Sequence, residues 1–216
     1  MAALGLISDV HATAAPVQEA LAIFKRAGVD QVLCAGDIAG YHDEVEQTVA
    51  LLVDNDVQAV RGNHDLRYLD RCDEHEDGPV AAFFRQLPAV LDIEIAGRRV
   101  CMVHAEPPDA CDGGGIRLLD QDGGVRPERA ELWTQQLAGC GCDVLVVGHS
   151  HQVFAERLGT SLVVNPGSTV FNHACAILVL PEMTVQVLPL SGQPVRRTWN
   201  WAAYMAGREM EPRSPK

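Results

Sequence analysis

The sequence is short of positive charge, and this shortage excludes several kinds of function. Among its 216 residues, 17 are Lys or Arg and 29 are Asp or Glu, which gives a formal net charge of −12. This balance argues against a broad basic face that grips nucleic acid and against electrostatic docking on an anionic membrane. Two bound divalent cations would still dominate the field locally, so a small anionic substrate agrees with the charge.

The chain also lacks a long apolar run and a leader-like beginning. No stretch approaches the roughly 20 apolar residues that span a bilayer. The opening "MAALGLISDVH" has no basic segment, and Asp9 interrupts its apolar run early. The seven Cys are an odd number, and several lie in strand-like runs, which favours free thiols in a reducing compartment. We therefore expect a cytoplasmic protein without membrane contact.

What the first third of the chain does contain is an alternation of strand and helix patterns. Residues 3–10, 31–37 and 57–60 are apolar runs of the kind that form buried strands. Between them, residues 15–28 and 42–56 repeat apolar side chains at the helical period, the first ending at a glycine stop signal. Near-continuous apolar strands joined by helices are typical of an α/β sheet covered on both faces.

The rest of the chain changes in texture. Residues 79–87 predict a short helix, and residues 89–104 predict a hairpin that turns at Ala96–Gly97. A long loop over residues 105–127 precedes another helix, and a run of strands follows to about residue 190. We expect residues 1–190 to form one domain, and residues 191–216 to form an extension whose end is disordered.

Polar side chains stand wherever a predicted strand ends. In open α/β sheets, sites form beyond the carboxyl ends of the strands. Five of the eight His lie at such ends, together with three Asp and one Asn: Asp9, His11, Asp37, Asn63, His64, Asp65, His104, His149 and His151. Burying so many ionisable groups without compensation would cost several kcal/mol each, so the pattern points to a metal centre.

The predicted ligands are too many for one ion. Seven strong candidates, with one carboxylate shared, make two four-ligand sites, and His64 is left free to act as an acid. Two cations about 3.5–4 Å apart can clamp an in-line displacement at phosphorus. Mixed imidazole and carboxylate ligands suit manganese, iron or zinc better than magnesium or calcium. The lone CxC at Cys140 and Cys142 has no second Cys pair at finger spacing.

Five ordered motifs carry a family resemblance. "DVH", "GDIAGY", "GNHD", a later lone His and "GHSH" together resemble the calcineurin-like metallophosphoesterase superfamily, over roughly residues 4 to 190. "GDIAGY", "RGNHD" and "VNPGS" look most like its small bacterial phosphodiesterases. The resemblance implies an α/β fold, a four-layer α/β/β/α sandwich of two mixed sheets flanked by helices, for the domain of residues 1–190.

The resemblance also implies a role for each residue of the site. Asp9, His11 and His151 would hold one divalent ion, while Asn63, His104 and His149 would hold a second, with Asp37 bridging both. The ions would be manganese, the favoured metal, or iron, zinc or nickel. A metal-bridging hydroxide would attack phosphorus. His64 would stabilise the transition state or protonate the leaving oxygen, and Asp65 would orient the His64 ring.

Three further residues are candidates for substrate contact. His42 stands where members of this kind often carry Gly, and His173 follows "VNPGS" where an Arg is often near. Arg61 can contact a phosphate through its guanidinium group. A solvated surface or turn position is the alternative for each, and these departures leave the substrate pocket open.

We expect a hydrolase of small phosphoesters, with a phosphodiesterase favoured. The alternatives are a phosphomonoesterase, a protein phosphatase or a dinucleoside polyphosphate hydrolase, and then a metal-binding scaffold without catalysis. Protein phosphatases of the superfamily carry an Arg in "GDxxDRG", whereas this chain reads "GDIAGYH". The expected partner is the small phosphoester substrate, and the sequence leaves a homodimer open.

Overall fold

The structure is a computed structural model that describes residues 1–72, 78–105 and 117–200. The expected disorder at the end of the C-terminal extension lies outside these residues, and the domain boundary at residue 190 stays a prediction. Within the described ranges, none of the helices combines the length and the apolar character that crossing a bilayer requires.

The elements follow the alternation that the sequence predicted. The helices are α1 (Ala14–Ala27), α2 (Val45–Asp54), α3 (Asn63–Leu69), α4 (Pro79–Gln86) and α5 (Pro127–Leu137). The strands are β1 (Ala2–Ile7), β2 (Gln31–Cys34), β3 (Gln58–Ala59), β4 (Val90–Ile95), β5 (Arg98–Val103), β6 (Val144–Val146), β7 (Phe154–Leu158), β8 (Ser161–Asn165), β9 (Ala174–Leu180) and β10 (Thr184–Pro189).

The strands form two mixed sheets of five, as the family resemblance implied. The first has the order β10-β9-β1-β2-β3, with β1, β2 and β3 parallel and β9 and β10 antiparallel. The second has the order β4-β5-β6-β8-β7, with a parallel centre of β5, β6 and β8 and antiparallel edges. The predicted hairpin at Ala96–Gly97 is confirmed, and both turn residues have positive φ.

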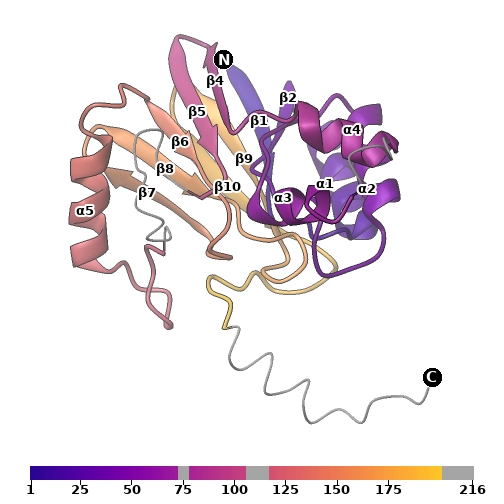
Figure 1. Ribbon diagram of the computed structural model, residues 1–216. Helices are drawn as coiled ribbons and strands as arrows, with labels where there is room; N and C mark the ends of the chain where they lie inside the picture. The colour runs from indigo at the N-terminus through magenta and orange to yellow at the C-terminus, as the bar shows by residue number, and fades with distance from the viewer. Residues whose placement is uncertain (73–77, 106–116, 201–216) are drawn as a thin grey trace.

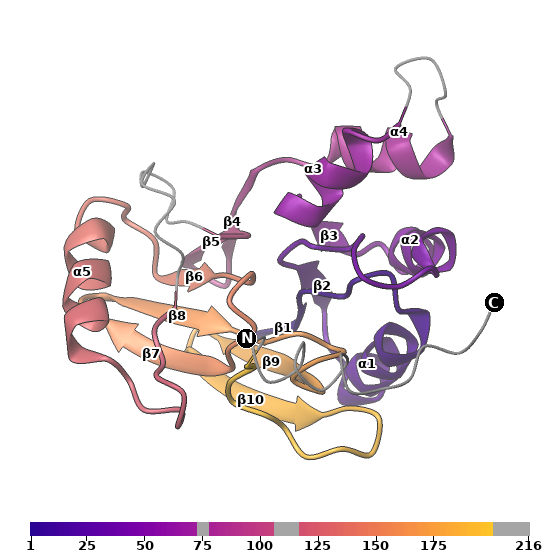
Figure 2. The ribbon, with the colours of Figure 1, turned by 60° about the horizontal axis from the view of Figure 1, so that its bottom comes forward.

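Helices cover the outer face of each sheet, so the molecule has four layers. Figures 1 and 2 show α1 and α2 on one flank and α5 on the opposite flank. Side chains on a strand alternate between its two faces, so one face of each sheet can point toward the other sheet. Leu6 of β1 and Val146 of β6 lie on these faces, in the apolar core that joins the sheets. Phe24 of α1 packs on the outer face of β1, where Gly5 leaves room for its ring. Trp133 of α5 packs in a third cluster on the second sheet.

The parallel strands of both sheets deliver their carboxyl ends to one region. The loops after β1, β2 and β3 leave the first sheet there, and the loops after β5 and β6 leave the second. One element was not expected: α3 begins at Asn63, directly after the short strand β3, where the sequence suggested only a polar strand end.

Candidate metal centre

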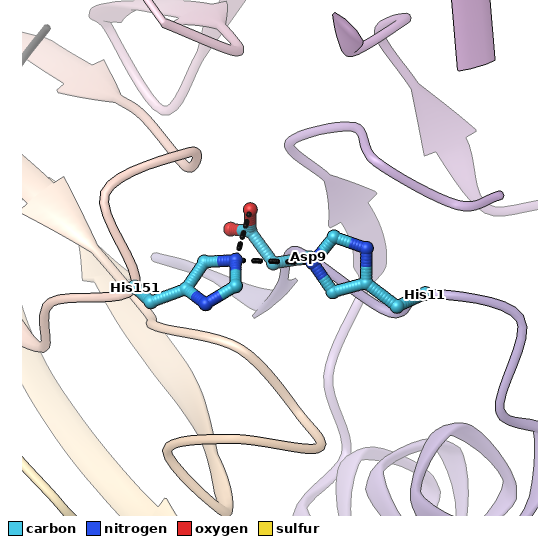
Figure 3. Close-up of side chains that lie close together, drawn as sticks. All are labelled: Asp9, His11 and His151. Carbon is cyan, nitrogen blue, oxygen red and sulfur yellow. Dashed lines mark hydrogen bonds and ion pairs between the residues drawn. The ribbon is translucent and has the colours of Figure 1, made fainter. Parts of the chain in front are cut away.

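A first group of possible ligands is buried in the loops that follow β1 and β6. Asp9, His11 and His151 are 0%, 0% and 3% exposed. The Nε2 atoms of His11 and His151 lie 3.0 Å apart, and His151 Nε2 lies 3.3 Å from Asp9 Oδ1. Figure 3 shows the two rings approaching from separate parts of the chain with the carboxylate beside them. Three donor atoms therefore converge on one point.

A second group lies next to the first and is more open. His104 Nε2 lies 3.3 Å from Asp37 Oδ2 and 3.2 Å from Asn63 Oδ1. His149 Nδ1 lies 2.9 Å from the same Asn63 oxygen. His104 is buried, Asn63 is half-buried and His149 is exposed. This group therefore reaches from the interior to the surface.

Asp37 joins the two groups. Its carboxylate clusters with His104 and His149, and it also clusters with His11 and His64, with all ligand atoms of each set within 4.8 Å of one another. The other set is Asp9, His11 and His151. The seven ligands expected from the sequence are thus brought into one continuous centre, with Asp37 at the junction.

The backbone at these ligands is held in an uncommon conformation. Five of the seven have a positive φ between 50° and 62°: Asp9, His11, Asp37, His149 and His151. Residues with a Cβ adopt the left-handed region rarely, and such strain clusters at functional sites. These conformations cost free energy, and they direct the five side chains toward the centre.

Neighbouring groups fix the orientation of the ligands. Ser8 Oγ and the His149 backbone N–H donate to the Asp9 carboxylate, at 2.7 Å and 3.0 Å. His104 Nδ1 lies 2.7 Å from the Ala35 carbonyl, so it donates there and turns Nε2 toward Asp37. A histidine whose outer nitrogen is held by a carbonyl is the usual support of a metal ligand.

The charges within the centre are strongly coupled. Burial would raise the pKa of Asp9, but the contact with His151 outweighs it and holds the pKa below its usual value. Burial would lower the pKa of His104, yet Asp37 raises it to about 9. Burial lowers the pKa of His11 to about 4. His104 in turn holds the pKa of Asp37 below its usual value against burial, so both buried carboxylates are ionised.

The donor set fits divalent cations. A neutral imidazole carries one hydrogen and one lone pair, and an ionised carboxylate only accepts. Carboxylate, amide and imidazole donor atoms therefore gather in both groups, and His104, whose pKa Asp37 raises, would offer a lone pair once a bound cation displaces its second proton. Such nitrogen and oxygen donors suit manganese, iron or zinc.

His64 is placed at the edge of this centre by α3. Its backbone N–H donates to Asp37 Oδ1 at 2.8 Å, and its half-buried ring lies 5.0 Å from the ring of His11. Gly62 precedes the helix with an ordinary φ of −104°, so it is not needed for a left-handed turn. A Cβ at Gly62 would instead collide with Asp37. The glycine of "GNHD" therefore provides room for the shared carboxylate.

Asp65 acts through the backbone. Its two oxygens accept the N–H groups of Ala39 and Gly62, at 2.8 and 2.7 Å. Burial raises the pKa of its carboxyl to about 7, against these two donors, which favour the charged form. These contacts tie the loop after β2 to the start of α3. That Asp65 orients the His64 ring stays a prediction.

The sequence also matches a known protein family. Residues 3–179 match the calcineurin-like phosphoesterase superfamily domain. The chain belongs to this superfamily. A probable metallophosphoesterase of Methanothermobacter thermautotrophicus is 27% identical over 192 residues, which cover 88% of this chain and 87% of that protein.

Solved structures of the superfamily show the same fold at low identity. A metallophosphoesterase from Sphaerobacter thermophilus has a TM-score of 0.65 at 18% identity, covering 98% of this chain and 95% of that chain. A putative diadenosine tetraphosphatase has a TM-score of 0.61 at 19% identity, covering 89% and 95%. An archaeal phosphodiesterase has a TM-score of 0.57 at 17% identity, covering 87% and 99%. Their titles name different activities, so the fold alone does not fix the substrate.

Sequence reasoning missed an aromatic group beside the first ligand group. The Phe171 ring stacks on His151 at 5.2 Å, and the Tyr41 ring lies 4.6 Å from that of His64. Trp199 packs against Phe171 at 4.9 Å. Tyr41 ends the motif "GDIAGY" and Phe171 follows "VNPGS", so their places next to motifs were the available signal.

The candidate substrate residues stand apart from the ligand clusters. Among the described residues, the three clusters of metal-binding type contain neither His42 nor His173. His42 reaches the aromatic group, with its ring 6.5 Å from that of Phe171. Arg61 is half-buried and its backbone N–H bonds the Pro88 carbonyl. Substrate contact by Arg61, His42 and His173 stays a prediction.

Proposed function

We propose that this protein is a phosphodiesterase that uses two divalent metal ions to hydrolyse small phosphodiesters. The observation that carries the proposal is the continuous ligand centre, in which two groups share Asp37 and His64 stands at the edge. A phosphoester hydrolase agrees with the superfamily. The preference for diesters and the number of ions belong to the proposal.

The two groups define which residues would hold each ion. Asp9, His11 and His151 would hold the first, and Asn63, His104 and His149 the second, with Asp37 contributing to both. When bound, two such cations supply Lewis-acid stabilisation of the phosphoryl oxygens and a hydroxide nucleophile near neutral pH. The donors combine imidazole nitrogens with carboxylate oxygens, which suits manganese, iron or zinc, and manganese is the metal we favour.

His64 would serve the leaving group. It belongs to a cluster with Asp37 and His11, yet its ring is half-buried and lies on the open side of that cluster beside Tyr41. Burial lowers the pKa of His64, so its imidazolium is the stronger acid toward a developing alkoxide, although a smaller fraction of the ring carries that proton near neutral pH. The anchoring of α3 by Asp65 would keep this ring in place.

Diesters are favoured over protein substrates by the sequence of the second motif. Gly40 and Tyr41 stand where protein phosphatases of the superfamily carry Asp and Arg, so that arginine is missing beside the ligand Asp37. A similar solved structure is titled a phosphodiesterase, and another a putative diadenosine tetraphosphatase. Hydrolysis of a dinucleoside polyphosphate is therefore the alternative that the test includes. The free thiols of the described cysteines support the proposal of a cytoplasmic setting.

The test is turnover by wild type and His64→Ala after reconstitution with manganese. We expect hydrolysis of bis(p-nitrophenyl) phosphate above that of p-nitrophenyl phosphate and of diadenosine tetraphosphate. In His64→Ala, kcat should fall by about a hundredfold or more, as loss of a general acid does, while metal content stays that of wild type. Metal-loaded wild type that cleaves none of these phosphoesters would contradict the proposal.

A further inference from the structure

We propose that a pocket beside the metal centre binds a nucleoside monophosphate group, either the distal half of a dinucleotide substrate or the nucleotide product. The pocket has a volume of about 460 Å³ and lies between residues 117–126 and residues 198–200. Its part in catalysis rests on the proposed function, whereas nucleotide binding can be measured without turnover.

The first wall of the pocket is a closed loop with a fixed shape. Leu119 and Val125 pair as an isolated antiparallel bridge, and the Arg126 N–H donates to the Leu118 carbonyl at 3.0 Å. Gln152, which is buried, accepts the N–H groups of Leu118 and Leu119 and donates to the Leu119 carbonyl at 2.8 Å. The loop is therefore held to the residue that directly follows His151.

The second wall is the beginning of the C-terminal extension. Thr198 pairs with Gln152 as a bridge, and its hydroxyl donates to the Gln121 carbonyl at 3.0 Å. Asn172 Nδ2 lies 2.7 Å from the Arg196 carbonyl and 3.0 Å from the His151 carbonyl. One buried amide thus ties the extension to the backbone of a proposed metal ligand.

The pocket and the metal centre share a wall of stacked rings. Trp199 lines the pocket and packs on Phe171 at 4.9 Å. Phe171 stacks on the His151 ring at 5.2 Å with an interplanar angle of 18°. Two ring-to-ring steps, of 4.9 and 5.2 Å, therefore separate the Trp199 wall of the pocket from a proposed ligand of the first ion.

The lining suits a group that is anionic at one end and planar at the other. Arg117 and Arg126 both line the pocket, in a chain of net charge −12. Guanidinium groups bind phosphate with paired hydrogen bonds. Leu119 and Trp199 supply an apolar surface for a base.

One carboxylate, that of Asp120, lines the pocket. Asp120 Oδ1 accepts the N–H groups of Asp122 and Gly124, at 2.9 and 2.8 Å. Glu128 Oε1 pairs with Arg126 at 2.7 Å, on an exposed surface where such a pair is worth little. A phosphate can therefore recruit Arg126 at small cost. The volume also fits, since ligand pockets commonly measure about 300–1,000 Å³.

Binding of adenosine monophosphate to the full-length, metal-free protein in EDTA tests the pocket by calorimetry. We expect one site, with ribose 5-phosphate and adenosine each bound at least about tenfold more weakly, because each lacks one half of the contacts. The double variant Arg117→Gln/Arg126→Gln should bind adenosine monophosphate at least about tenfold more weakly than wild type. Arg157→Gln removes an exposed arginine outside the pocket and should bind as wild type does. Trp199 is left in place because it packs toward the metal centre.

Turnover of the manganese-loaded enzyme supplies the second readout. For 5′-phosphoadenylyl-(3′→5′)-adenosine, whose 5′-phosphate can meet the two arginines while its bridging phosphate lies at the metal centre, the double variant should raise KM by about tenfold with kcat within twofold, while kcat/KM for bis(p-nitrophenyl) phosphate stays within twofold. Absence of adenosine monophosphate binding, equal binding of ribose 5-phosphate, or an unchanged double variant would overturn the pocket. Wild type that binds the nucleotide but cleaves neither diester would sink the proposed function and leave the pocket standing.

Discussion

The two ligand groups of the metal centre differ in how they meet solvent. Asp9, His11 and His151 are enclosed, whereas the group of Asn63, His104 and His149 ends in an exposed imidazole. This difference indicates that a substrate approaches from the side of the second group. An ion in the first group would be enclosed by protein, and an ion in the second would lie next to the exposed His149.

The surroundings of the groups explain this difference. Phe171 and Tyr41 lie against His11, at ring distances of 5.5 and 4.7 Å, and so cover the first group. The second group depends on Asn63, which stands at the first position of the short helix α3. A ligand at the end of a helix near the surface can move more easily than one that is fully buried.

The largest predicted effect is that of removing Asp37, the carboxylate that the two groups share. Asp37→Ala takes a ligand from both groups at once, so we expect both ions to bind more weakly. Because metal charge stabilisation is worth several kcal/mol, kcat/KM should fall by at least about a thousandfold. Activity and metal content are measured together after reconstitution. Retention of both ions with wild-type kcat/KM would show that Asp37 is not shared.

Removing one imidazole from each group should change the Tm by different amounts. His151→Ala leaves the buried Asp9 carboxylate without the imidazole nitrogen that lies 3.3 Å from it, so we expect a lower Tm as well as loss of an ion. His149→Ala removes an exposed ring, so we expect weaker binding of one ion with Tm within about 2 °C of wild type in the metal-free protein. Thermal unfolding in EDTA separates the two effects. Equal Tm values for the two variants would argue against a difference between an enclosed group and an open group.

The smallest predicted effect concerns the anchor of α3. Asp65→Asn places an amide N–H₂ opposite one of two backbone donors, so a buried N–H loses its acceptor. We expect a loss of about 1–3 kcal/mol in the free energy of unfolding and a fall in Tm of several degrees. Asp120→Asn is the matched control, because Asp120 also accepts two backbone N–H groups but is exposed. If both variants unfold at the same temperature, the anchoring role is wrong.

Much of the fold could be predicted because the signals were local. Helix α1 follows its apolar repeat and ends at Gly28, whose φ of 68° is the left-handed conformation expected of a helix stop. The hairpin at Ala96–Gly97 and the buried strand β8 could be predicted from short runs in the same way. The convergence of polar strand ends followed from the general rule for α/β sheets.

The rest depends on tertiary contacts that no local pattern encodes. Gly62 looks like a turn residue in the sequence, but its role is to leave room for Asp37, which lies 25 positions earlier. Phe171 belongs to an irregular segment, and its stacking on His151 arises only when the loops of both sheets meet. The prediction that Asp65 orients the His64 ring is not tested by its described hydrogen bonds, which go to two backbone amides.

The most direct test of a two-ion centre with an enclosed and an open group is metal content followed over time in excess EDTA. Wild type reconstituted with manganese should begin with about two ions per chain and lose them in two phases, the open group first. In His149→Ala the fast phase should disappear, while the slow phase remains. A single ion per chain, or two ions that leave in one phase in both proteins, would contradict the account.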